Sequence, residues 1–144
     1  MVQEGFWTMN RLDFQRLSDL RLKEAKALLV AGFPEGAYYL ARYAIECALK
    51  ACIAKRTREH DFPEKDSSNF YVHDLEKLLG HAKLKSEFDL ALRDNPAMNT
   101  NWIAAKDWSE KSRYDRKTVE EATGLLMAIE GQNGGLLQWV QKHW

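Results

Sequence analysis

The sequence predicts an all-α bundle folded as one domain. Its 144 residues suit a single domain. Apolar residues recur near helical spacing along much of the chain, whereas the β-branched runs and alternating patterns typical of strands are nearly absent. Asparagine, proline and glycine stand where these apolar segments begin and end. The expected elements are therefore helices separated by short connectors.

The first helix is expected from about Arg11 to Ala31. Asn10 can cap its N-terminus, Asp13 favours the positive end of the helix dipole, and Gly32 is a natural C-cap. Apolar residues near helical spacing predict its core-facing side: Leu17, Leu20, Ala27, Leu28 and Ala31.

A second helix is expected from about Glu35 to Arg58, after a short connector. Pro34 suits a helix start, where its missing amide donor costs nothing, and the short connector predicts an antiparallel pair of helices. The second helix carries an apolar stripe rich in small residues, which let another helix approach closely: Ala37, Leu40, Ala41, Ala44, Ile45, Ala48, Leu49 and Cys52.

The second half of the chain is predicted to hold shorter helices. A polar loop over 59–69 precedes them, and 99–114 shows no clear pattern beyond the apolar Trp102, Ile103 and Trp108. The last long helix has a predicted core face of Val119, Ala122, Leu125, Leu126 and Ile129. The expected helices are Leu75–Leu79, opened by His73-Asp74 and ended by Gly80; Lys85–Arg93, stopped by Asn95-Pro96; Arg116–Glu130, ended by Gly131; and a terminal helix within Leu136–Trp144.

Composition excludes several classes of protein. The 21 Lys and Arg residues balance 21 Asp and Glu residues, which argues against general coating of nucleic acid. No apolar run approaches the roughly 20 residues of a membrane span, and the N-terminus lacks the features of a secretory signal. We expect a cytoplasmic protein that does not associate with membranes, with Cys47 and Cys52 as reduced thiols.

Three motifs, in this order, resemble the HEPN domain, a small nucleotide-binding helical bundle of higher eukaryotes and prokaryotes. They are AYYLARYAIECALKA over 37–51, HDLEKLL over 73–79 and SRYD over 112–115. The resemblance implies an up-and-down bundle of four to five helices that usually forms a homodimer. The bundle would cover 11–131, after an N-terminal extension over 1–10 and before a short helix or tail over 132–144.

Many HEPN domains are metal-independent endoribonucleases, and this chain departs from their pattern. Their site is an Arg followed four to six positions later by a His, at the start of the last long helix. No His follows Arg113 or Arg116 at that spacing. Without the imidazole no obvious group is suited to transfer protons near neutral pH. The sequence therefore predicts a non-catalytic binding module, with no catalytic residue, metal site or cofactor.

The expected ligand is a nucleotide or RNA, and the expected partners are a nucleotidyltransferase or an antitoxin of a toxin–antitoxin system. Arg42, Glu46 and Lys50 share one helix face, so Glu46 could orient Arg113 and Lys50 could meet a phosphate. Alternatively, the ladder solvates the helix or pins a neighbouring one. Tyr39 and Tyr43 beside it would form a dimer interface or a stacking surface for a base. The predicted ligand-binding residues are Arg113, Tyr114, Glu46, Lys50, Tyr43 and Arg116.

A basic segment around the start of the last long helix carries interleaved aromatic residues, a pattern that suits a nucleotide or single-stranded RNA. Alternatively, its tryptophans belong to the core and its charges are solvated. The segment contains the cations Lys106, Lys111, Arg113, Arg116 and Lys117 and the aromatics Trp102, Trp108 and Tyr114.

Two other functions stay open. One is a divergent endoribonuclease in which Asp115 or His73 supplies the acid or base. At the start of its helix, however, the His73-Asp74 pair is also explained by capping, with Asp74 favouring the dipole and His73 as a cap. The other function is a scaffold whose exposed Trp and Leu residues bind a protein partner.

Overall fold

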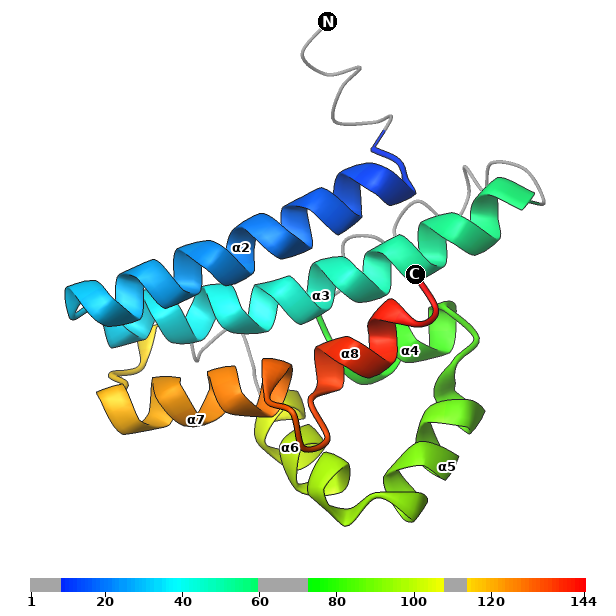
Figure 1. Ribbon diagram of the computed structural model, residues 1–144. Helices are drawn as coiled ribbons and strands as arrows, with labels where there is room; N and C mark the ends of the chain where they lie inside the picture. Colours follow the sequence, from blue (N-terminus) through cyan, green and yellow to red (C-terminus); the bar gives the residue numbers. More distant parts are fainter. Residues whose placement is uncertain (1–8, 60–72, 108–113) are drawn as a thin grey trace, which may run out of the picture.

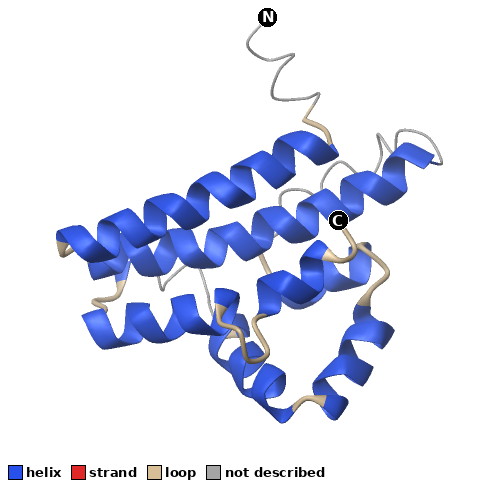
Figure 2. Cartoon of the chain, in the orientation of Figure 1, coloured by secondary structure: helices blue, strands red, loops and turns tan. Residues whose placement is uncertain are grey.

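The computed structural model describes residues 9–59, 73–107 and 114–144, which form seven helices and no strand (Figures 1 and 2). The predicted all-α class is confirmed, with more helices than the four to five expected. None of the described helices is both long and apolar enough to cross a bilayer. The helices are α2 (Arg11–Ala31), α3 (Pro34–Glu59), α4 (Leu75–His81), α5 (Lys85–Asp94), α6 (Pro96–Lys106), α7 (Val119–Glu130) and α8 (Leu136–Gln141).

Helices α2 and α3 form the predicted antiparallel hairpin (Figure 1). The Asn10 side chain accepts a hydrogen bond from the Asp13 amide, and the Asp13 carboxylate accepts one from the Asn10 amide. Gly32 ends α2 with φ 93°, a left-handed conformation that glycine adopts without strain. Pro34 then begins α3. The caps and the start of α3 are therefore confirmed.

The predicted core face of α2 is wrong at three of its five positions, whereas Leu17 and Leu28 are partly buried. Leu20 is 47% exposed, and Ala27 and Ala31 are also exposed. The buried face includes a serine, because the Ser18 hydroxyl donates a hydrogen bond of 2.7 Å to the Ala44 carbonyl of α3 and so needs no water. A buried serine interrupts the apolar periodicity of this face, so the pattern alone does not locate it. The buried residues are Phe14, Ser18, Leu22 and Ala25.

Helix α3 is the centre of the bundle and packs against α2, α4, α7 and α8 (Figure 1). Its predicted stripe of small residues is buried, with only Leu40 partly exposed. Ala41, Ala44 and Ala48 have no exposed surface, so neighbouring backbones can approach closely. Leu136, Leu137 and Val140 of α8 lie in the same core cluster, and the segment over 132–144 is thus packed onto the bundle.

The shorter helices differ from the prediction in three places. Helix α6 lies in the segment that showed no pattern, where Asn95 caps the helix and Pro96 is its first residue. Helix α4 continues through Gly80 instead of ending there, since glycine alone does not end a helix. Helix α7 begins three residues later than expected because Thr118 and Glu121 form a capping box, and this leaves Val119 49% exposed rather than in the core.

The turn between α7 and α8 depends on a glycine. Gly134 has φ 75°, and a Cβ there would lie 2.7 Å from the Met98 backbone nitrogen. We predict that Gly134→Ala lowers the free energy of unfolding by about 2 kcal/mol, measured by urea denaturation. Gly124 in α7 has open space around its Cβ position, so Gly124→Ala is expected to raise that energy by about 0.5–1 kcal/mol. Equal stability of the two variants would contradict the described turn.

Candidate functional site

A cluster of charged side chains is buried on one side of α3. Arg42, Glu46 and Lys50 are spaced one turn apart, which places them on the same side of the helix. Arg42 Nη1 lies 3.6 Å from Glu46 Oε1, and Lys50 Nζ lies 3.0 Å from Glu46 Oε2. Their side chains are only 3%, 3% and 7% exposed, in chain order. One carboxylate therefore bridges two cations in the interior.

His73, directly before the α4 cap, joins this group from another part of the chain. Its Nδ1 lies 2.9 Å from Glu46 Oε2, and its side chain is 41% exposed. Arg42 Nη2 donates a hydrogen bond of 2.9 Å to the His73 carbonyl, and Arg42 Nε donates one of 3.3 Å to the Ala105 carbonyl of α6. We call Arg42, Glu46, Lys50 and His73 the α3 charge cluster. It ties α3 to the start of α4 and the end of α6.

The cluster settles two alternatives that the sequence left open. Its burial shows that the ladder pins neighbouring elements and does not solvate the helix. His73 is also not the cap of α4. Asp74 holds that place, since its Oδ1 accepts hydrogen bonds from the Glu76 and Lys77 amides. Helical spacing predicts that three charges share a side, but it does not show whether other elements cover that side.

The contact with Glu46 fixes the hydrogen positions of the His73 ring. A carboxylate only accepts hydrogen bonds, so the Nδ1 atom that lies against it carries a hydrogen. With Nδ1 as the donor, Nε2 of the neutral ring is an acceptor.

Burial shapes the electrostatics of the cluster. It lowers the pKa of Arg42 to about 10, although the Glu46 carboxylate opposes the shift. The guanidinium is still charged at neutral pH. Two buried cations thus face one buried carboxylate, and the carbonyls of His73 and Ala105 provide further acceptors for Arg42. The buried side chains of α3 in this cluster therefore carry a net positive charge, because two cations are paired with one carboxylate.

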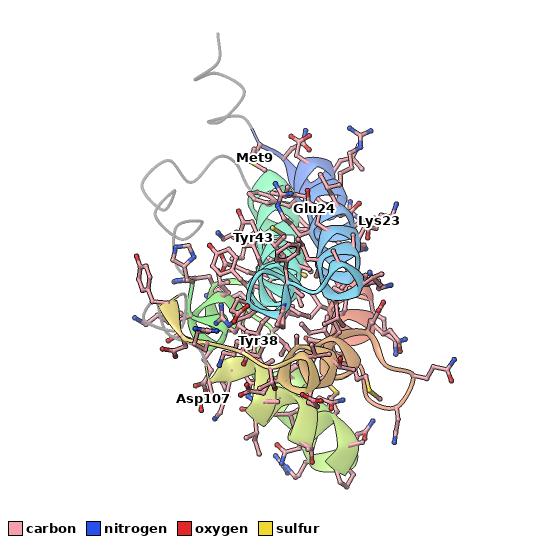
Figure 3. All side chains as sticks on the ribbon, turned by 90° about the vertical axis from the view of Figure 1, so that its left-hand side faces the viewer. Met9, Lys23, Glu24, Tyr38, Tyr43 and Asp107 are labelled. Carbon is pink, nitrogen blue, oxygen red and sulfur yellow. The ribbon has the colours of Figure 1, made fainter. Side chains whose placement is uncertain are left out.

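Three half-buried tyrosines flank the cluster on α3, and we call Tyr38, Tyr39 and Tyr43 the tyrosine face. The rings of Tyr39 and Tyr43 are stacked with centroids 6.4 Å apart. The Lys117 ammonium lies 4.5 Å from the centroid of Tyr38. Figure 3 looks along α2 and α3 and shows Tyr43 on the side of α3, with Tyr38 nearer the start of α7. Burial raises the pKa of Tyr43 to about 12, so its hydroxyl remains a donor.

The segment before α7 is attached to the same end of α3. Arg116 Nε lies 3.6 Å from Glu35 Oε2, which also accepts a hydrogen bond of 3.3 Å from the Lys117 amide. Backbone hydrogen bonds, from its own amide and that of Lys117, lower the pKa of Glu35. These contacts place two cations, Arg116 and Lys117, beside the tyrosine face. No sequence signal pairs Lys117 with Tyr38, because the two residues are far apart along the chain.

The residues predicted to bind a ligand lie in different surroundings. Glu46 and Lys50 are in contact and buried, and Tyr43 flanks them. Arg116 pairs with Glu35 at the start of α3, and 96% of its side chain is exposed. Tyr114 is 83% exposed. Arg113 lies outside the described residues.

The basic segment with interleaved aromatics is divided by the structure. Trp102 is 5% exposed and packs edge-on against Phe88, with ring centroids 4.7 Å apart, so it belongs to the core and does not offer a stacking surface. Ile103 is 55% exposed instead. Lys106 is exposed, as is Asp115, the other acid or base candidate beside His73. Trp108 and Lys111 lie outside the described residues.

Neither cysteine is suited to nucleophilic chemistry. Cys47 and Cys52 are free and buried. Burial raises the pKa of each thiol to about 12, and the thiolate is the reactive form. Within the described ranges, no group of three or more His, Cys, Asp and Glu residues could hold a metal ion.

The buried carboxylate yields a stability prediction. Glu46→Ala leaves Arg42 and Lys50 buried without their anion and is expected to lower the free energy of unfolding by about 3–5 kcal/mol at pH 7. Glu24→Ala is the matched control. Glu24 also pairs with a cation, Arg21, but the Glu24 side chain is 40% exposed. Its expected cost is about 0–1 kcal/mol, by the same denaturant titration. A comparable small loss for both variants would show that the cluster is not a buried ion network.

The described contacts thus give a half-exposed histidine held by a buried carboxylate, a stacked pair of tyrosines, and a third tyrosine whose ring lies under Lys117. Aromatic rings and cations of this kind suit a planar, negatively charged ligand. Comparison with protein-family models, curated proteins and solved structures gives no match for this chain.

Proposed function

We propose that this protein is a binding module for a nucleotide or for single-stranded RNA, held on the tyrosine face of α3. The observation that carries the proposal is the set of partly exposed tyrosines on α3: Tyr39 and Tyr43 are stacked, and the Lys117 ammonium lies over the ring of Tyr38. Bases stack on aromatic side chains with little dependence on their identity, while nearby cations attract the phosphates. Both types of group are present here within one surface.

The proposal assigns two kinds of role. The tyrosine face, Lys117 and Arg116 contact the ligand, because these side chains are partly or fully exposed. Glu46 and Lys50 position the surface from within, because their charged atoms are buried and bonded to each other. The balanced net charge of the chain is compatible with this arrangement, since binding at one site needs only a local excess of cations.

The resemblance to HEPN domains supports the same proposal and extends it. It places the bundle among small helical modules that bind nucleotides. It also suggests a homodimer that works with a nucleotidyltransferase or an antitoxin. Within this extension the chain is a non-catalytic member, because the Arg and His of the HEPN nuclease motif do not occur together at their spacing.

Binding is tested with a short fluorescent single-stranded RNA and with ATP, by fluorescence anisotropy and competition at low salt. Tyr39→Ala and Lys117→Ala are each expected to weaken RNA binding about tenfold, since a stacked base or a phosphate contact is lost. Lys23→Ala removes an exposed cation of α2 that makes no contact with the tyrosine face, and it is expected to bind as the wild type does. No binding by the wild type, or equal loss in all three variants, would contradict the proposal.

A second candidate function, a divergent endoribonuclease, is favoured by the contact between His73 and Glu46. In such a reaction Nε2 of neutral His73 takes the proton of a ribose 2′-hydroxyl as O2′ attacks the adjacent phosphorus. The bond from phosphorus to O5′ breaks, and the leaving oxygen takes a proton from water. The products are a 2′,3′-cyclic phosphate and a 5′-hydroxyl. A carboxylate behind a histidine orients such a base in other enzymes.

Cleavage is tested by incubating end-labelled RNA with the purified protein in EDTA. The binding proposal predicts intact RNA. The second candidate predicts cyclic-phosphate products that His73→Gln removes and that His81→Gln, a change at an exposed residue of α4, retains. Cleavage that survives His73→Gln would exclude His73 as the base and identify another group or a contaminating nuclease.

A further inference from the structure

We infer that α2 is the interface of a homodimer, in which it packs antiparallel against α2 of a second copy of this chain. Four partly exposed residues of α2 form the contact, and we call Leu17, Arg21, Glu24 and Leu28 the α2 seam. The dimer needs no bound ligand, so it is independent of the binding proposed for the tyrosines. It assigns a surface to the homodimer considered there.

The α2 seam lies on a side of the helix that the other described helices leave partly open. Its members follow one another at intervals of four, three and four residues, which keeps them on one side of a helix. Ser18 instead faces α3, and Lys26 faces α7 through an ion pair of 2.8 Å with Glu130. Among the described helices only α3 and α7 pack extensively against α2, which lies along one edge of the molecule (Figure 1).

The seam and its surroundings expose apolar surface that one copy of the bundle does not bury. Leu17 and Leu28 are only partly buried, Leu20 is 47% exposed, and Ala27 and Ala31 are exposed. These are the five residues whose spacing predicts the core-facing side of α2. Their periodicity is explained when this side of the helix is buried against a second molecule.

The side chains along the seam complement themselves when one copy is reversed. In an antiparallel pair centred between residues 22 and 23, Leu17 meets the partner's Leu28 and Arg21 meets the partner's Glu24. Two-fold symmetry repeats both contacts. A parallel pair in register places each charge against its own copy instead. Because like charges opposite each other are unfavourable, the charges select the antiparallel arrangement.

The charges and the leucines make different contributions to this interface. Arg21 and Glu24 already pair within one chain, where their side chains are 27% and 40% exposed. Two such pairs that meet across the two-fold axis form a ring of alternating charges, which sets orientation and register. Leu17 and Leu28 at the ends of the seam supply apolar burial. One side of one helix is a small interface, so we expect a dimer that dissociates in the micromolar range.

The experiment measures the oligomeric state by sedimentation equilibrium over a range of protein concentrations. The wild type is expected in a monomer–dimer equilibrium. Arg21→Glu and Glu24→Arg each place like charges opposite one another and are expected to raise the dissociation constant of the dimer at least about tenfold. An equimolar mixture of the two variants is expected to dimerise again, because a copy with two anions in the seam then meets a copy with two cations.

Lys23→Glu and Asp19→Arg are the matched controls. They make the same two charge reversals at exposed residues of α2 outside the seam, and both are expected to dimerise as the wild type does. Circular dichroism of every variant verifies that the helices are intact.

Three results would overturn the inference. A wild type that is monomeric at every concentration excludes the homodimer, and equal association of all four variants places the interface on another surface. A mixture of Arg21→Glu and Glu24→Arg that stays monomeric contradicts the antiparallel register. RNA binding measured on the same samples keeps the proposed function separate, because that function fails only when the wild type binds neither RNA nor ATP.

Discussion

The structure depends on one buried carboxylate. Glu46 bridges Arg42 and Lys50 in the interior of the bundle and holds His73 at its edge. Burying such charges is costly, and their attraction for each other does little more than offset the cost, so their main contribution is to specify which elements meet. Through Arg42 the network joins α3 to the start of α4 and the end of α6, two helices that are much shorter than α3.

This constraint separates what the sequence predicts from what it does not. Local signals locate α2 and α3 well, because Asn10, Gly32 and the alanine stripe of α3 act within a few residues. The buried face of α2 is not predicted by local signals, because it depends on the hydrogen bond from Ser18 to Ala44 of another helix. Helix α6 was missed although Asn95-Pro96 is a typical helix start, because the same pair also reads as the end of α5.

The candidate site follows the same division. Spacing alone places Arg42, Glu46 and Lys50 together and Tyr39 next to Tyr43. That the ladder is buried, that His73 reaches it and that Lys117 covers Tyr38 are consequences of packing between distant segments. The role proposed for the ladder therefore changes. Its residues were expected to contact the ligand, but they are buried, and we now propose that they support the tyrosines, the histidine and the nearby cations.

The most direct measurement of the central claim is the tautomer of the neutral His73 ring, determined by long-range ¹H–¹⁵N correlation NMR. The wild type is predicted to hold its hydrogen on Nδ1, because Nδ1 faces the buried Glu46 carboxylate. In Glu46→Gln, where the side chain also offers an amide donor, that preference should be lost. A wild-type ring with its hydrogen on Nε2, or a tautomer unchanged by Glu46→Gln, would contradict the account.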